Sequence, residues 1–519
     1  MPFFRKNFPF IISFFFASLL AAFLFYPLIS RGMEIFSDST KYLNTASNLS
    51  AGYGFSLRCP PKVHPNTHWA PGYSALIALF LVLNIHWLTA CKIISILCYL
   101  FLLTGIFLYV YKITDSFLLA LFSEAAVGFH PKILRYSGAI LSEPLSWLCL
   151  IAISALLTAL ILNPRKKWAI VLGVVLGLSM LVRYAYIPLG PFCVGLFFLL
   201  CSRIPWLKRL KLAILICIPA TIIFGSWLLR NWLLAGKTAT SRPPTGSLSS
   251  NLLDGFVSWF DALFQKSYSP LQPLFWIVIA SLITVALISF FRRKDQEPSA
   301  ASVALLVNLL LAAGYTFGLV LLRSYRAALA LNDRKFTQVI LLFVLMLSFA
   351  AATKYRKYIS RIFLGLLTVF LTISVALGIS AIPELKTRWL GYHEFQSSPT
   401  MKFALHQKVP PRRIITNDWE AFWLWTGTCP RFFPGGRTIK IKASHFQEQG
   451  AKMLVWFKRS GRPALLRREN VEWDVPVRFL EFEDGYVYQF KKRGQQQTVA
   501  PPAPIEEPVE SSEEEETEE

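Results

Sequence analysis

Charged residues are scarce in this sequence. Asp, Glu, Lys and Arg make up only 16% of its 519 residues, whereas 54% are hydrophobic and 15% are aromatic. In soluble domains about a quarter of all residues are charged, so this composition excludes an ordinary soluble protein. Many apolar runs reach the roughly 20 residues that a helix needs to cross a bilayer. The sequence therefore predicts a polytopic α-helical membrane protein.

Two kinds of binding motif are also missing. The Gly52-Tyr53-Gly54 segment lacks the lysine of a P-loop, so energy from cytoplasmic ATP is not indicated. The net charge of +23 would suit a nucleic-acid partner, but no motif that reads DNA or RNA is visible. Lys and Arg instead fall in short clusters between apolar runs, as the positive-inside rule predicts for membrane proteins. We expect no nucleic acid among the partners.

Few cysteines lie outside the apolar runs. Only Cys59 and Cys429 fall in segments that we place outside the cytoplasm, where an oxidising compartment would let them pair. The other six lie in or against apolar runs and are expected to be packing residues.

The basic clusters set the expected topology. Arg5 and Lys6 precede the apolar run Phe8–Ile29, which is too long for the core of a signal peptide and is interpreted as a retained first span. If every cluster is cytoplasmic, one helical hairpin lies between each successive pair of clusters. The eleven expected spans are 8–29, 88–111, 115–130, 144–162, 168–183, 184–201, 211–234, 271–291, 299–322, 336–352 and 361–382.

This topology divides the chain into three parts. Residues 1–383 form the transmembrane domain, with a first outer loop over 30–87. In this loop Pro71–Leu83 is expected to be a short helix that dips into the outer leaflet or packs against the bundle. Residues 384–493 form a small α/β domain on the outer side. Its expected strands are 414–416 and 453–457, followed by a hairpin over 477–490 with an Asp484-Gly485 turn, and its helices lie near 419–426 and 444–450. The Glu-rich tail 494–519 is expected to be disordered.

The first outer loop contains the most informative segment. Tyr42, Leu43, Ala46 and Leu49 recur at helical spacing, which predicts a short helix in the membrane interface. Asp38 lies at the start of this helix. A carboxylate at that place could accept a proton from an attacking hydroxyl if partial burial tunes its pKa, although it could also be a solvated loop acid or a helix cap.

Other polar residues are expected at the same outer face. Glu143 begins the fourth span, where it could be a plain helix start or a functional membrane acid. Arginines are disfavoured on the outer side, yet several lie there, and guanidinium groups suit a phosphate or pyrophosphate. The arginines considered are Arg183, Arg230 and Arg334, the last followed by Lys335. His64 and His68 alone are a weak metal signal, and hydrogen bonding to substrate or a loop role is the alternative.

Six short segments occur in an order that is typical of one family. They are DSTKYLNTASNLSAGYGFS after the first span, HWAPGYSAL, LSEPLSW, GVVLGLSMLVRYAYIPLGP, SWLLRNWLLAG and LNDRKF. In this order, the chain resembles the GT-C membrane glycosyltransferases, specifically the family 39-like relatives of the protein O-mannosyltransferases and of the aminoarabinose transferase that acts on lipid A. The resemblance covers roughly residues 8–383.

The resemblance implies an enzyme that transfers a sugar from a polyprenyl-phosphate donor to the hydroxyl of a lipid, polysaccharide or protein. Asp38 matches the first-loop aspartate that acts as base, and Glu143 matches the acid at the outer end of the fourth span. A single displacement of this kind inverts the anomeric carbon. The implied location is the cytoplasmic membrane of a bacterium, with the active site on the outer face.

The implied substrate-binding residues are basic or lie in the matching motifs: Arg183, Arg230, Arg334, Lys335, His68 and Tyr73. Many relatives have two adjacent acids in the first loop, whereas Ser39 stands in the second position here. No metal ligand is assigned, and a divalent metal stays a possible cofactor.

Three other functions remain open at this point. A transporter or lipid flippase would be expected to show inverted repeats and broken helices. A membrane scaffold would leave Asp38 and the outer arginines scattered around the bundle. A polysaccharide ligase or polymerase would use a lipid pyrophosphate and would not need Asp38.

Overall fold

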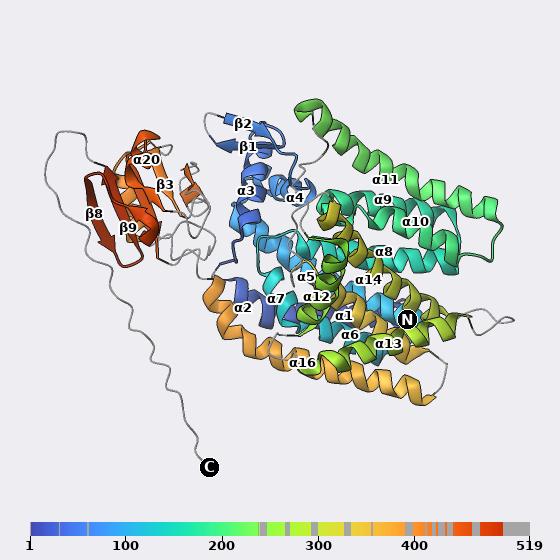
Figure 1. Cartoon of the computed structure of the whole chain (residues 1–519). Coiled ribbons are helices and arrows are strands. Elements are labelled where there is room, and N and C mark those ends of the chain that lie inside the picture. Colours follow the sequence, from blue (N-terminus) through green and yellow to red (C-terminus); the bar gives the residue numbers. More distant parts are fainter. Residues whose placement is uncertain are drawn as a thin grey trace, which may run out of the picture. The chain divides into compact units, whose positions relative to one another are not determined.

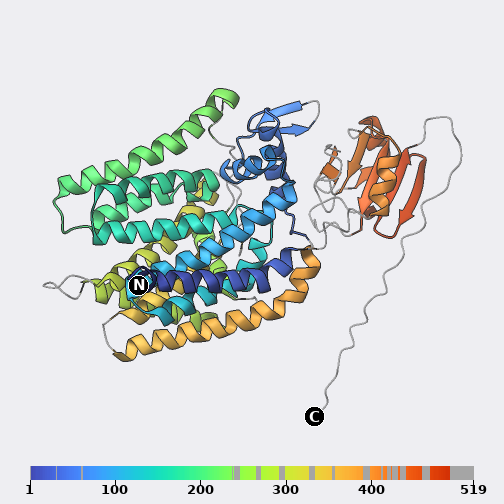
Figure 2. The same ribbon diagram turned by 180° about the vertical axis from the view of Figure 1, so that it is seen from behind.

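A computed structural model describes the chain over most of its length. The described residues are 2–30, 32–59, 62–236, 238, 246–264, 270–291, 299–325, 334–353, 357–389, 398–410, 413–417, 422–423, 431–432, 440–458 and 468–490. The chain forms two compact units. The first consists of residues 1–58 and 62–392, and the second of residues 59–61 and 393–519. Figures 1 and 2 show the helices of the first and the sheet of the second.

The first unit is a bundle of helices. Its N-terminal half contains α1 (Pro2–Leu19), the π-helical η1 (Leu20–Phe25), α2 (Tyr26–Ile29), α3 (Ser37–Ser50), α4 (Gly72–Val82), α5 (Trp87–Thr114), α6 (Phe117–Gly128), α7 (Pro131–Ser137), α8 (Glu143–Leu162) and α9 (Lys166–Val182). The rest contains the 3-10 helix η2 (Tyr184–Tyr186), α10 (Leu189–Leu200), α11 (Trp206–Ala235), α12 (Leu248–Leu263), α13 (Gln272–Phe291), α14 (Ala300–Tyr325), α15 (Thr337–Ala352) and α16 (Lys357–Trp389).

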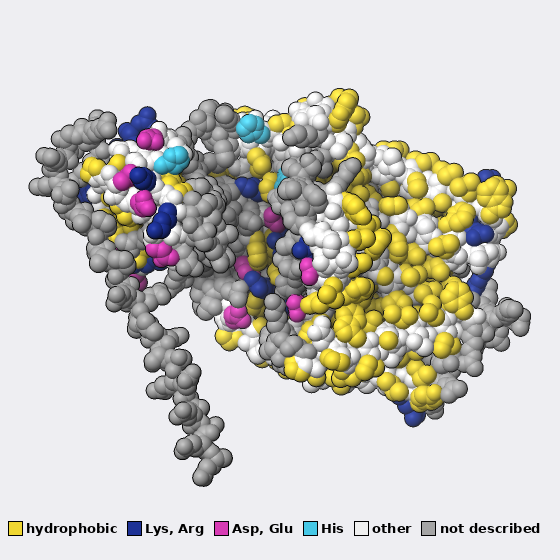
Figure 3. All heavy atoms as spheres, in the orientation of Figure 1, with side chains coloured by type: hydrophobic (Ala, Val, Ile, Leu, Met, Phe, Trp, Pro, Cys, Tyr) yellow, Lys and Arg dark blue, Asp and Glu magenta, His cyan; other side chains and the backbone are white. Residues whose placement is uncertain are grey.

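Helices lie over all eleven ranges expected to cross the membrane. Within the described residues, seven are long and apolar enough to span a bilayer, and there is an eighth if the bent pair α6–α7 is one span. The other three ranges hold the shorter helices α9, α10 and α15. Figure 3 shows a broad band of hydrophobic side chains across the helical unit, as expected of a surface that faces lipid. These findings confirm a polytopic helical membrane fold.

Helix α15 lies at the centre of the bundle. Its side chains are buried on every side, from Thr337 to Ala350, because α14, α16, α6 and α12 all pack against it. A helix that is apolar all round is stable only when neighbours cover its whole circumference. The residues just before α15 are therefore held firmly at one end of the bundle.

Helices α9 and α11 approach each other closely. A Cβ atom on Gly173 would lie 2.2 Å from the Ile216 carbonyl oxygen, and one on Gly177 would lie 2.9 Å from Cβ of Ile223. This glycine pair four residues apart follows the small-xxx-small rule for packed membrane helices. The contact fixes the end of α9, which carries Arg183.

The first outer loop is folded against the same end of the bundle. Helix α3 is the helix that was predicted in the membrane interface. It ends before Gly52 and Gly54, whose φ angles are +82° and +66°. Strands β1 (Ser56–Cys59) and β2 (Lys62–Pro65) follow, and α4 is the expected short helix. Figures 1 and 2 agree that α3 and α4 lie at the end of the bundle opposite the start of α1.

Two contacts attach the start of this loop to the segment between α7 and α8. Backbone hydrogen bonds of 3.0 Å join Glu34 to Gly138 and Ile140. The Glu34 carboxylate also accepts two bonds from the Arg135 guanidinium, at 2.8 and 3.1 Å. The strand-like pairing brings the start of α3 next to the start of α8, although about a hundred residues separate them in sequence.

Helix α12 was not predicted, because residues 235–270 lie between the expected spans 211–234 and 271–291 and were expected to form an outer loop. It buries Trp259, Phe260 and Leu263 against α14 and α15, and the Trp259 indole donates to Thr316 Oγ1 at 2.7 Å. Its apolar residues follow helical spacing over too few residues for a membrane span, so the length criterion missed it.

The second unit contains a five-stranded sheet in the order β4-β3-β6-β9-β8. Its elements are α18 (Pro399–His406), β3 (Ile414–Thr416), β4 (Arg431–Phe432), β5 (Ile441–Lys442), α20 (Ala443–Glu448), β6 (Met453–Phe457), η5 (Arg468–Asn470), β7 (Val471–Glu472), β8 (Val477–Phe482) and β9 (Gly485–Phe490). Strand β3 is parallel to β4 and β6, whereas β6, β9 and β8 are antiparallel. The predicted strands, hairpin and second helix are confirmed.

One detail of the hairpin was wrong. The two turn residues are Glu483 and Asp484. Gly485 is the first residue of β9 and is paired with Phe482 of β8. Three predictions lie outside the residues whose side chains the structure describes. They are the pairing of Cys59 with Cys429, most of the helix near 419–426, and the disordered tail 494–519.

Candidate active site

Asp38 lies in the first turn of α3 and is held from two sides. Its Oδ2 accepts a hydrogen bond of 2.9 Å from Nη2 of Arg334, and its Oδ1 accepts one of 3.2 Å from the Trp69 indole. Burial opposes the negative charge, but Arg334 and Lys335 outweigh it, so the pKa of Asp38 lies below its usual value. The carboxylate is therefore ionised at neutral pH, and 28% of its side chain is exposed.

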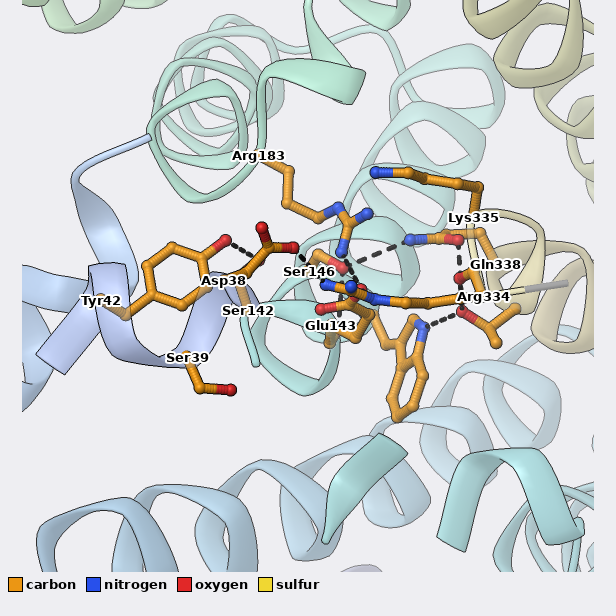
Figure 4. A network of polar contacts seen from close by, with 12 residues as sticks. Asp38, Ser39, Tyr42, Ser142, Glu143, Ser146, Arg183, Arg334, Lys335 and Gln338 are labelled. Atoms are coloured by element: carbon orange, nitrogen blue, oxygen red, sulfur yellow. Dashed lines mark hydrogen bonds and ion pairs between the residues drawn. The ribbon is translucent and has the colours of Figure 1, made fainter. Parts of the chain in front are cut away.

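Glu143 is the buried centre of the cluster. Its side chain has no exposed surface, and its Oε1 pairs with Nη1 of Arg183 at 2.6 Å and with Nε of Arg334 at 2.5 Å. Figure 4 shows Asp38, Glu143 and the two arginines converging from α3, α8, the end of α9 and the segment before α15. A buried carboxylate is stable only when cations and hydrogen bonds compensate for the water it has lost.

Lys335 adds a third positive charge. Its amine lies beside the Arg183 guanidinium in Figure 4. Burial and the charges of Arg183 and Arg334 lower the pKa of Lys335 to about 8. The negative charges of Asp38 and Glu143 raise this pKa and offset part of the decrease. With Lys335 protonated, three cations face two carboxylates, so the cluster carries one excess positive charge. Such a cluster favours an anionic ligand.

Ser39 faces away from the cluster, as Figure 4 shows. Its hydroxyl accepts from the Phe36 amide and donates to the Ile140 carbonyl, both at 2.8 Å, and its side chain is fully buried. The residue after Asp38 therefore caps α3 and ties it to the segment before α8. Ser39 thus has a structural function in this chain.

Hydrogen bonds from neighbouring helices fix the segment that carries Arg334. The Thr337 hydroxyl donates to the Arg334 carbonyl at 3.0 Å and accepts from the Trp147 indole at 3.2 Å. Tyr315 donates to the Lys335 carbonyl at 3.0 Å. Because α8, α14 and α15 all contribute, the two cations are positioned by the packed bundle and not only by their own charges.

Arg230 lies outside this cluster. Its guanidinium donates to the carbonyls of Phe55 at 2.6 Å and Asn66 at 3.1 Å, and it stacks over the Trp227 ring at 4.8 Å. These contacts bind the first outer loop to α11. The structure thus groups Arg230 with the loop backbone and not with the carboxylates. Phosphate binding by Arg230 stays a prediction.

His68 and Tyr73 also lie beside the cluster and not in it. The His68 ring packs edge-on against Trp69 at 4.3 Å. Tyr73 is 1% exposed and packs edge-on against Tyr42 at 5.2 Å, behind the hydroxyl contact of Tyr42 with Ser142. Tyr73 is therefore a packing residue in this conformation. Substrate binding by either side chain stays a prediction.

The direct contact of Trp69 with Asp38 was not predicted from the sequence. A half-buried indole needs an acceptor for its N–H, and an isolated acid in the same loop is the obvious partner, so this rule could have found the contact. As for metals, no three His, Cys, Asp or Glu residues form a ligand set within the described ranges.

Sequence comparisons find no relative of this chain. No family model matches it, and no curated protein matches it significantly. Comparison with solved structures does find similar folds. The apo structure of ArnT from Cupriavidus metallidurans aligns with 92% of this chain and 97% of its own, with 10% identity and a TM-score of 0.53. The arabinofuranosyltransferase AftD from Mycobacteria aligns with 93% of this chain and 41% of its own, with 14% identity and a TM-score of 0.50.

These alignments define the fold. The chain has the polytopic helical fold of the GT-C membrane glycosyltransferases, as the order of its motifs predicted. A second structure of ArnT, bound to undecaprenyl phosphate, aligns with a TM-score of 0.47. At these identities the likeness concerns the fold alone, and the activity has to be argued from the site.

Proposed function

We propose that this protein is a membrane glycosyltransferase that moves a sugar from a polyprenyl-phosphate carrier to an acceptor hydroxyl at the outer face of the cytoplasmic membrane. The observation that carries the proposal is the convergence of two carboxylates and three cations from four separate segments. A scaffold has no need for such a cluster, because buried ion pairs contribute little net stability.

The cations suit the leaving group. A phosphodiester donor carries one negative charge, which matches the single excess positive charge of the cluster. When the bond between the anomeric carbon and the phosphate oxygen breaks, its electrons pass to the phosphate oxygen. The negative charge of the phosphate therefore grows. Arg334 and Lys335 are placed to stabilise this developing charge, because preorganised cations in a dry site act most strongly on charge that forms in the transition state.

Asp38 is the proposed base. Each of its oxygens accepts one hydrogen bond, and a carboxylate oxygen has a second lone pair for the acceptor hydroxyl. The acceptor oxygen loses its proton to Asp38 as it attacks the anomeric carbon from the face opposite the phosphate. This single displacement inverts the anomeric centre. Glu143, fully buried, holds Arg183 and Arg334 in position.

The deciding experiment compares cells that lack the gene with cells complemented by variants. Mass spectrometry of lipids and glycans identifies the glycosylated species that disappears on deletion. We expect wild-type protein to restore it and Asp38→Asn to fail although the variant accumulates normally. Asp254→Asn is the matched control, because its carboxylate also pairs with an arginine, Arg323 at 3.0 Å, but is 52% exposed.

Restoration by Asp38→Asn would refute the proposed base. If deletion leaves every glycosylated species in place, the protein is not the transferase we propose. A flippase for the same carrier would also lose the glycosylated product on deletion, but its purified form would not transfer sugar in a detergent solution.

A further inference from the structure

Arg334 occupies the space between two carboxylates in a particular way. Its Nη2 donates to Asp38 and its Nε donates to Glu143. These two nitrogens lie on one edge of the guanidinium, whose donors form a fixed fork. The two acceptor oxygens, from α3 and α8, therefore lie side by side against that edge. Two carboxylates held in this way would repel each other without a cation between them.

A divalent cation is the other group that holds two carboxylates together. Mg²⁺ is typically bound by one or two carboxylates together with substrate phosphates. In this chain the guanidinium already occupies the position between Asp38 and Glu143. The residue after Asp38 supplies no further carboxylate, because it is Ser39, which faces away from the cluster and bonds to the backbone of Phe36 and Ile140.

The remaining oxygen of the pair does not favour a metal. Oε2 of Glu143 is buried and has no hydrogen-bond partner within the described residues. It belongs to a carboxylate that already carries two guanidinium groups, from Arg183 and Arg334. A dication at this oxygen would meet two positive charges and few other ligands. A hydroxyl donor, from water or from a sugar, fits this oxygen better.

We propose that Arg334 takes the place of a divalent cation between Asp38 and Glu143, and that the site works without a divalent metal. Arg334 is then a positioning residue that holds the two acids together while its charge faces the donor phosphate. The inference deepens the proposed function, because it concerns the same site, but its test does not need the transfer reaction.

The test measures Mn²⁺ binding by electron paramagnetic resonance on the full chain purified in detergent and stripped of metal with EDTA. We expect wild-type protein and Asp38→Asn to give the same Mn²⁺ titration. We expect Arg334→Met to gain about one Mn²⁺ per chain, because the two carboxylates are then free to share a cation. The gain should disappear in the Asp38→Asn/Arg334→Met double variant. Arg323→Met, which frees a single exposed carboxylate, should gain nothing.

Two results of the binding titration would overturn the inference. One is a Mn²⁺ ion bound by the wild-type protein and lost in Asp38→Asn, a comparison that holds even if Arg334→Met does not fold. The other is a folded Arg334→Met protein that binds no more Mn²⁺ than wild type. Transfer that EDTA abolishes and Mn²⁺ restores would also overturn it. If no sugar transfer is found but the Mn²⁺ results are as expected, the proposed function fails and this inference stands.

Discussion

Lys335 makes the clearest quantitative prediction. Its pKa of about 8 lies below the usual 10.5 because the amine is buried beside Arg183 and Arg334. An anion bound by these cations would remove the repulsion and return the pKa toward its usual value. Anion binding should therefore take up a proton wherever Lys335 is neutral in the free protein. Near pH 8 half of the amines are neutral, so the uptake should be about half a proton per chain.

The size of the effect follows from the pKa difference. Lowering the pKa from 10.5 to about 8 corresponds to about 3 kcal/mol of destabilisation of the ammonium form. If a bound anion fully relieves this destabilisation, Lys335 should raise the affinity for the anion by up to about 100-fold at pH 7. Above pH 8, where the free amine is neutral, Kd should rise about tenfold per pH unit until the amine of the complex also titrates.

Calorimetry measures both quantities. A short dialkyl phosphodiester is the ligand, because its single charge does not titrate in this range, and buffers of different ionisation enthalpy report the proton uptake. Lys335→Met is the control and should bind up to about 100-fold more weakly at pH 7, with no uptake. Equal uptake in wild type and Lys335→Met, or an affinity that does not change between pH 7 and pH 9, would refute the reasoning.

The other predictions concern the surroundings of the site. Trp69→Phe removes a bond to Asp38, so the acidic limb of the pH–rate profile should move up by less than about one pH unit. Gly173→Ala should lower the unfolding temperature by forcing α9 from the backbone of α11, at a cost of about 1–3 kcal/mol, whereas Gly195→Ala, with open space at its Cβ, should not. Arg230→Met should destabilise the first outer loop by about 1–3 kcal/mol, measured as faster proteolysis between α3 and α4.

Each of these has a contrary outcome. An unchanged pH profile in Trp69→Phe would mean that the indole does not tune Asp38. Equal melting temperatures for Gly173→Ala and Gly195→Ala would contradict the close contact of α9 with α11. Proteolysis of Arg230→Met at the wild-type rate would show that the loop is held by other contacts.

Much of the fold could be predicted from the sequence, because its strongest signals are periodic. Apolar runs and helical spacing placed the spans and α3, and the alternation in residues 477–490 placed the hairpin. The presence of glycine at position 485 has a cause other than the predicted Asp-Gly turn. A Cβ on Gly485 would lie 2.5 Å from the Trp456 carbonyl and 2.7 Å from the Thr400 hydroxyl, so close packing and not the turn conformation requires glycine there. Such a contact is not visible in the local sequence.

The candidate site was predicted in composition but not in arrangement. The polar residues at one face could be recognised because lipid excludes unpaired charges, and the structure brings Asp38, Glu143, Arg183, Arg334 and Lys335 together. The sequence could not show which arginine pairs with which acid, because the partners are up to 296 residues apart. The contacts of Arg230 could not be predicted for the same reason, since its partners are loop carbonyls that carry no side-chain signal.

The hydroxyl of Ser39 has a mechanical consequence. By bonding to Phe36 on one side and Ile140 on the other, it ties the start of α3 to the segment before α8, so Asp38 and Glu143 are carried by one connected support. The hydroxyls of Thr337 and Tyr315 hold the segment with Arg334 and Lys335 from the other side. The acids and the cations therefore keep their spacing whether or not a ligand is bound.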